Sequence, residues 1–181
     1  HLPPVTATAM RFSVVLALLF PLLRRPEKGQ WLNLLIACWC MGALHFALVF
    51  LALRRSADVS SVAILMQVYV PISTILAVAI LGERIGWRTV SGIALAFCGV
   101  LVVGLDPVVL AQLDVLAMVL VSAFFLGLGT IFMRRIQGVG LFSFQAWNAL
   151  LSLVPLVILA WLFESPGQAL ATTDWSSPAL P

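Results

Sequence analysis

The chain has 181 residues, of which 62% are hydrophobic and 9% are charged, and its mean hydropathy is +1.13. A soluble domain of this length cannot bury so much apolar surface, so the composition indicates a protein whose solvent is lipid. The formal net charge is +3, with no basic patch interleaved with aromatic residues, which argues against RNA or DNA as a partner.

Six apolar runs follow one another along the chain. They cover residues 5–23, 31–53, 59–81, 89–105, 115–133 and 141–163, and Arg11 is the one charged residue inside them. Each run approaches the roughly 20 residues with which a helix crosses about 30 Å of hydrocarbon. In lipid every backbone group must be hydrogen-bonded within its own segment, and the runs lack the alternating polarity of barrel strands. The sequence therefore predicts an all-α, polytopic membrane helix bundle with six transmembrane helices.

The connections between the runs are short, and their basic residues are unevenly distributed. Alternate connections carry seven basic residues on one side and two on the other: Arg24, Arg25, Lys28, Arg84, Arg88, Arg134 and Arg135 against Arg54 and Arg55. Lys and Arg accumulate in the cytoplasmic loops of membrane proteins. The first set is therefore predicted to face the cytoplasm, and six crossings then place both ends of this chain outside.

The ends suggest a piece of a longer protein. The chain opens on His1-Leu2-Pro3-Pro4, without an initiator Met or a basic leader. Residues 164–181 form a polar stretch that contains proline and carries no basic tail. We therefore expect the sequence to be a fragment.

Motifs for covalent chemistry are missing. The chain has no G-x-S-x-G, H-E-x-x-H or Walker loop, and its three cysteines have neither zinc-ligand nor C-x-x-C spacing. Glu83 has no second carboxylate nearby in the sequence to form an acid and base pair. We expect no enzyme, no cofactor and no metal. The classes of protein that remain are a secondary transporter, a channel, and a subunit that packs against partner helices.

A few polar residues lie inside the runs, and their depths follow from the rise of about 1.5 Å per helical residue. Arg11 lies about 9 Å from the outer end of its run, as either an interface anchor or a pathway residue. His45 and Gln67 each lie about 12 Å from the outer end, on neighbouring antiparallel helices that could bring them together. Tyr69 follows Gln67, and Pro71 can bend this helix near the midplane. These residues predict a polar pocket. The alternative is that His45 and Gln67 only form interhelical hydrogen bonds, worth about 0.6 kcal/mol each.

Small residues at helical spacing predict close helix packing in the fourth and fifth runs. The fourth run could instead offer this face to a second copy of the protein, which makes a homodimer one possible partner. The small residues are Gly92, Ala96 and Gly99 in the fourth run and Ala123, Gly127 and Thr130 in the fifth.

Several stretches resemble one family of transporters. They are residues 1–4 leading to Met10-Arg11-Phe12, the segment 67–71, Ile80-Leu81-Gly82-Glu83-Arg84, the segment 92–102 and Gly129-Thr-Ile-Phe-Met-Arg-Arg135. Their order and spacing are similar to the EamA-type family of the drug/metabolite transporter superfamily, and among its members to exporters of amino-acid metabolites. The likeness runs along nearly the whole chain.

The resemblance implies ten helices in two inverted five-helix repeats. Residues 1–105 would then be the first repeat without its first helix, and residues 106–181 the start of the second. As a repeat would require, Arg11 and Asn148 lie at similar depths from opposite faces, about 9 and 10 Å. Where many relatives carry a Trp, this chain has Phe124-Phe125-Leu126-Gly127, which predicts a less polar wall.

The resulting functional hypothesis is a multi-pass secondary transporter of the bacterial inner membrane. By resemblance it exports small metabolites, amino acids or their derivatives, through alternating access around a midplane site. The expected pathway residues are Arg11, His45, Gln67, Tyr69 and Asn148, with His45 as the side chain that titrates near neutral pH and could couple protons. Gly82, Glu83 and Arg84 are expected to fix the following loop rather than to touch substrate. The alternative is a non-transporting membrane subunit that packs against partner helices.

Overall fold

The computed structural model describes residues 4–56, 58–105 and 107–163. All secondary structure in these residues is helical, and six helices are long and apolar enough to cross a membrane. These spans are Val5–Leu22, Trp31–Arg55, Val59–Leu81, Trp87–Gly104, Leu113–Arg134 and Leu141–Leu162. The predicted all-α class with six spans is confirmed, and the apolar runs lie within about two residues of the observed helices.

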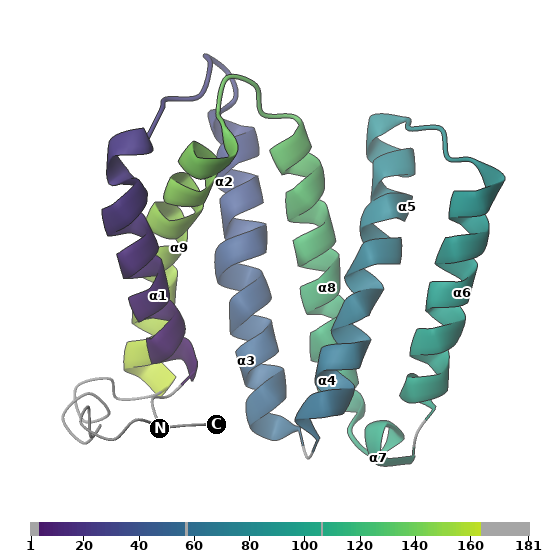
Figure 1. The fold of residues 1–181 in the computed structure, drawn as a ribbon. Coiled ribbons are helices and arrows are strands. Elements are labelled where there is room, and N and C mark those ends of the chain that lie inside the picture. The colour runs from purple at the N-terminus through teal and green to yellow at the C-terminus, as the bar shows by residue number, and fades with distance from the viewer. Residues whose placement is uncertain (1–3, 57, 106, 164–181) are drawn as a thin grey trace.

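The helices stand side by side, and neighbours in space are often distant in sequence (Figure 1). The N-terminal helix α1 packs on the last helix α9, while α8 packs on α2, α3 and α5. The helix α6 stands at the edge beside α5 (Figure 1). The spans are built from α1 (Pro4–Leu19), α2 (Trp31–Cys38), α3 (His45–Arg55), α4 (Val59–Leu65), α5 (Tyr69–Leu81), α6 (Trp87–Gly104), α8 (Leu113–Arg134) and α9 (Leu141–Phe163), and the short α7 (Pro107–Leu110) lies between α6 and α8.

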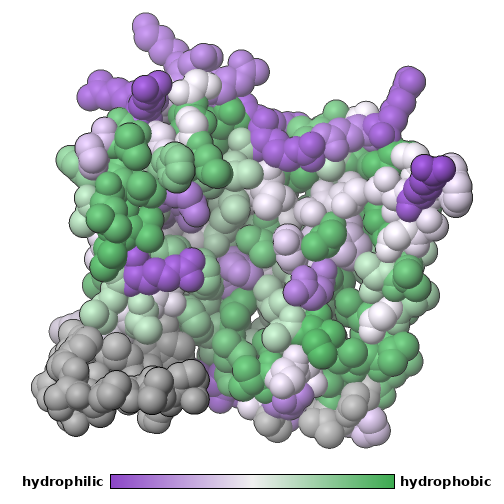
Figure 2. Space-filling view, viewed as in Figure 1, coloured by the Kyte–Doolittle hydropathy of each residue, from purple (hydrophilic) through white to green (hydrophobic). Residues whose placement is uncertain are grey.

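The α1–α2, α5–α6 and α8–α9 connections lie at one end of the bundle, and the α3–α4 and α6–α8 connections lie at the other (Figure 1). Hydrophilic side chains gather at the first end, whereas the flanks of the helices are largely apolar (Figure 2). We call the first end the inner end, because its three connections are those predicted to face the cytoplasm.

This orientation gives a direct prediction. Because basic loops stay inside, a green fluorescent protein fused after Gly86 or Gly138 should fluoresce, and alkaline phosphatase at the same sites should be inactive. After Ser56 or Gln112 the phosphatase should be active and the fluorescent protein dark. The measurement is the paired activity of alkaline phosphatase and green fluorescent protein fusions at each site. External activity at Gly138 would overturn the orientation.

The second span changes helix type in its middle. Between α2 and α3 the chain makes a π-helical turn, Trp39–Leu44, and such turns occur often at functional sites. Two glycines allow other helices to approach it. A Cβ on Gly42 would overlap Ser152 of α9, and a Cβ on Gly129 of α8 would lie only 3.1 Å from the Cys40 Cβ. The π-helical turn is therefore held tightly between α8 and α9.

The third span is also interrupted. A 3₁₀ turn, Met66–Val68, separates α4 from α5 and immediately precedes the turn that contains Pro71. Proline lacks an N–H, and its ring displaces the carbonyl four residues earlier, here that of Gln67. At the inner end α5 stops at Gly82, which has φ +67°, a conformation that favours glycine. The Gly82 N–H then donates to the Val78 carbonyl at 3.1 Å.

In the described part of the chain, many of the buried apolar side chains gather in three clusters. Near the outer end, Ala52, Val62, Leu65, Val109, Val115 and Val119 join α3, α4, α7 and α8. Between α1 and α9, the cluster contains Val5, Phe12, Ala149, Leu156 and Ala160. Towards the inner end, Leu34, Ala37, Cys38 and Phe144 join α2 to α9.

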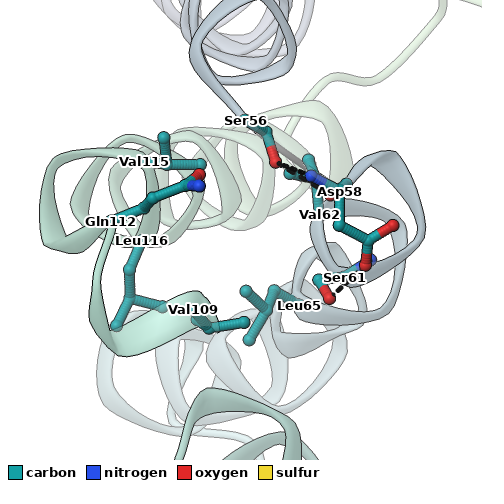
Figure 3. A pocket seen from close by; sticks show the side chains of 9 residues that line it. All are labelled: Ser56, Asp58, Ser61, Val62, Leu65, Val109, Gln112, Val115 and Leu116. Carbon is teal, nitrogen blue, oxygen red and sulfur yellow. Dashed lines mark hydrogen bonds between the residues drawn. The ribbon is translucent and has the colours of Figure 1, made fainter. Parts of the chain in front are cut away.

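The outer turn between α3 and α4 is closed by a helix cap (Figure 3). The Asp58 carboxylate accepts hydrogen bonds from the backbone N–H groups of Ser60 at 3.1 Å and Ser61 at 2.9 Å. The Ser61 hydroxyl also donates to this carboxylate, and these bonds hold the pKa of Asp58 below its usual value. The hollow beside it has a volume of only about 10 Å³, so it has room for about one water and not for a metabolite.

The two packing faces predicted from small residues differ in the structure. On α8, Ala123 is fully buried, and a Cβ on Gly127 would come within 3.3 Å of the Ser73 backbone of α5, as expected. On α6, Gly92 and Gly99 have no neighbouring atoms within 4 Å of a Cβ position. None of the α6 residues is buried among the described part of the chain. That predicted face therefore has no helix packed against it here.

Candidate functional site

A cavity of about 190 Å³ lies among α1, the π-helical turn, α3, α8 and α9. It is lined by Arg11, Phe12, Val15, Met41, His45, Phe46, Leu126, Gln145, Asn148 and Ala149. By helical rise, Arg11 lies about 10 Å and His45 about 15 Å from the outer ends of their helices, and Asn148 about 10 Å from the inner end of α9. The cavity is therefore near the middle of the membrane.

Arg11 places a cation on this cavity. Its guanidinium carbon lies 5.9 Å from the ring centroid of Phe12 and 6.0 Å from that of Phe46 on α3, within range for cation–π contacts. The two rings meet edge to face at 5.6 Å. The side chain thus extends sideways toward α3 instead of along α1, and Arg11 remains exposed.

His45 is buried and held by one residue of α8. Ser122 donates a hydrogen bond through Oγ to the His45 carbonyl oxygen at 3.1 Å, and this Oγ lies 2.8 Å from Nδ1. We assign the imidazole proton to Nδ1, because the Ser122 carbonyl oxygen at 3.4 Å can only accept a hydrogen bond and the hydroxyl hydrogen is already donated to the His45 carbonyl. Nε2 then carries the lone pair, and it has no hydrogen-bond partner in the described part of the chain.

Two amides on one face of α9 complete the polar lining. Asn148 is buried, and its Oδ1 lies 3.4 Å from Ser152 Oγ. Ser152 donates its one hydroxyl hydrogen to the Cys38 carbonyl at 3.1 Å, the shorter of the two contacts, which ties α9 to the start of the π-helical turn. Gln145 lies three residues before Asn148 and is exposed toward the cavity. Gln145 and Ser122 were not predicted from the sequence, although the three-residue spacing of Gln145 and Asn148 is a signal for the first.

Gln67 and Tyr69 do not line this cavity. Gln67 is exposed on the 3₁₀ turn, and Tyr69 is partly buried at the start of α5. The 3₁₀ turn packs on α8 and α6. The structure therefore joins Arg11, His45 and Asn148, which come from three spans, and leaves the Gln67–Pro71 segment elsewhere. Leu126, from the stretch that departs from the family pattern, forms part of the cavity wall as an apolar residue.

The Gly82-Glu83-Arg84 segment lies at the inner end, away from the cavity. Glu83 forms a two-point ion pair with Arg134 of α8, with N–O distances of 2.6 and 3.3 Å. Arg135 donates to the Ile80 carbonyl at 2.9 Å, so both arginines join the end of α8 to the end of α5. Arg84 is exposed. A second hollow of about 280 Å³ lies beside this pair, lined mainly by α5 and α8.

The chemistry that these residues offer is non-covalent. In the part of the chain that the structure describes, no group of three or more His, Cys, Asp or Glu side chains could hold a metal ion. What the cavity does present is one guanidinium, one imidazole lone pair, two amides and a partly aromatic wall. Such groups bind a small polar molecule by hydrogen bonds and charge, without changing it.

Six membrane-long helices, four of which line a polar cavity at mid-depth, are typical of polytopic membrane transporters. The chain belongs to the EamA-like transporter family, whose family model matches residues 1–105. It is a multi-pass membrane protein, and its family points to transport rather than to enzymatic catalysis.

One curated relative extends the likeness beyond the region of the family model. Over 187 aligned residues, which cover 98% of this chain, the sequence is 25% identical to a protein of Escherichia coli (strain K12) called "Probable amino-acid metabolite efflux pump". The alignment covers 62% of that relative, so the chain spans about three fifths of its length. No solved structure matches the chain.

Proposed function

We propose that this protein is a secondary transporter that exports small metabolites, amino acids or their derivatives, across the bacterial inner membrane. The observation that carries the proposal is the cavity at mid-depth, where Arg11, His45 and Asn148 meet from three different spans. Polar groups inside a membrane are costly and are typical of substrate pathways. The family and the name of the relative support the direction and the class of substrate.

The proposed mechanism is alternating access, in which helices move around a fixed binding site. The cavity opens to one side at a time, and the substrate leaves chemically unchanged. Exposed ion pairs at both ends of α8, Glu83 with Arg134 at the inner end and Arg55 with Asp114 at 3.5 Å at the outer end, are weak enough to break and form during such a movement.

The test is to express the protein from its full reading frame and to measure metabolites in the medium by mass spectrometry. We expect at least one amino acid or derivative to accumulate outside faster than in cells with an empty vector. Purified protein in liposomes should then exchange labelled against unlabelled metabolite with saturation, as a carrier does. Conduction without saturation would indicate a channel, and the absence of any exported metabolite would contradict transport.

A further inference from the structure

The charge of Arg11 is not balanced by any acidic residue in the described spans. The described carboxylates are Glu27, Asp58, Glu83 and Asp114, and all four lie at helix ends or in connections. Two of them pair with Arg134 and Arg55. The contacts of the Arg11 guanidinium within the described part of the chain are the two aromatic rings. The cavity therefore carries one positive charge at mid-depth without a matching anion among the residues that the structure describes.

An unbalanced cation in this position selects the charge of what enters. A guanidinium presents parallel N–H donors that match the two oxygens of a carboxylate, and the low dielectric of the membrane strengthens this pair. A cationic ligand would instead meet the Arg11 charge with no carboxylate on the cavity wall to offset it. A phosphate monoester carries close to two negative charges at neutral pH, so a single arginine would leave one of them unmatched.

The remaining lining groups fit the rest of a small carboxylate. His45 is held through Nδ1, so its Nε2 is free to accept a hydrogen bond from an N–H or O–H group. Gln145 and Asn148 can each donate or accept. Phe46 and Leu126 provide apolar surface. The volume of about 190 Å³ is below the roughly 300 to 1,000 Å³ of sites for drug-sized ligands, and it suits a small metabolite.

We infer that Arg11 is the anion-binding residue of this cavity and that the transported metabolite is recognised through a carboxylate. This inference rests on the proposed transport function. It names Arg11 as the residue that selects the substrate by its positive charge. Metabolites with a compact carboxylate are transported, and amines that lack a carboxylate are not.

The experiment compares the metabolites in the medium of three cell lines. They express the full-length wild-type protein, its Arg11→Gln variant and its Arg11→Lys variant. Every metabolite that the wild type exports is classified by mass spectrometry as a carboxylate, a phosphate ester or an amine without a carboxylate. We expect the exported compounds to be carboxylates. Their export per protein molecule should fall about tenfold or more in Arg11→Gln, because a charge pair in a low dielectric is lost. Arg11→Lys should retain part of it, since the charge remains without the two-point geometry.

The matched control is Arg25→Gln, which removes an arginine from an inner connection outside the cavity and should export at the wild-type rate. Protein amounts in the membrane are measured for all variants, so that export is always given per molecule. Export of amines without a carboxylate, or unchanged carboxylate export by Arg11→Gln, overturns this inference while transport itself stands. A wild type that exports nothing removes the proposed function, and this inference with it.

Discussion

Replacing Gly42 with alanine is expected to lower the thermal unfolding midpoint of the purified protein by about 5 °C, and the membranes should contain less protein. The added Cβ would lie 2.6 Å from the Ser152 Cβ and 2.8 Å from the Asn148 Oδ1, and it would overlap the Ser152 Oγ. To make room, α9 must move away from the π-helical turn, and the hydrogen bond from Ser152 to the Cys38 carbonyl is strained or lost. Overpacking of this kind typically costs about 1 to 3 kcal/mol.

Gly92→Ala is the matched control, because it makes the same replacement in another span. A Cβ on Gly92 meets nothing within 4 Å, and alanine favours the helix over glycine by up to about 1 kcal/mol. We expect its midpoint to stay the same or to rise. The midpoints are measured by tryptophan fluorescence during heating. Equal midpoints for the two variants would show that α9 does not pack on Gly42 as described.

The second large effect concerns His45. In His45→Leu, export per molecule should fall about tenfold, because the Nε2 acceptor in the cavity is lost while the size of the side chain is nearly kept. Ser122 retains its hydrogen bond to the backbone carbonyl at position 45, so the replacement leaves the Ser122 hydroxyl with a partner. The loss should persist across a series of external pH values if His45 only binds substrate. If His45 also couples protons, the wild-type rate should depend on pH and the residual rate of the variant should not.

Gln67→Leu is the comparison for this variant, since both residues were expected in one pocket and the structure separates them. Gln67 is exposed and does not line the cavity, so its replacement should leave export per molecule unchanged. Normal export by His45→Leu, with only its protein amount reduced, would assign His45 a structural role. A loss with Gln67→Leu as large as with His45→Leu would restore the common pocket.

The spans and the depths of polar residues could be predicted from the sequence, because both depend on length alone. The apolar runs located six helices, and the rise per residue gave the depths of Arg11, His45 and Asn148, about 9 and 12 Å from the outer end and 10 Å from the inner end. Gly82 could likewise be read as the end of a helix before a charged connection.

The direction in which each helix turns its polar residues could not be predicted. A span that is apolar around its whole circumference carries almost no periodic signal, so the sequence did not show that Gln67 points away from His45. We also could not predict the π-helical turn at Trp39–Leu44 or the packing of α1 on α9 by considering one segment at a time. In both cases the elements in contact are more than 100 positions apart in the chain, as Gly42 is from Ser152.

The most direct test of the cavity as a transport pathway is the labelling of two adjacent cysteine variants. Val15 lines the cavity, whereas Val14 is 57% exposed on the outside of α1 and does not. Val15→Cys and Val14→Cys are compared in a Cys98→Ser background, because Cys98 is exposed while Cys38 and Cys40 are buried. A membrane-impermeant thiol reagent reacts only with a thiolate that water reaches.

We predict that Val15→Cys is labelled in both right-side-out and inside-out membrane vesicles, as alternating access requires, and that Val14→Cys is labelled in neither because lipid covers it. Absence of labelling at Val15→Cys in both kinds of vesicle, or equal labelling of the two variants, would contradict a water-filled pathway at the Arg11, His45 and Asn148 cavity.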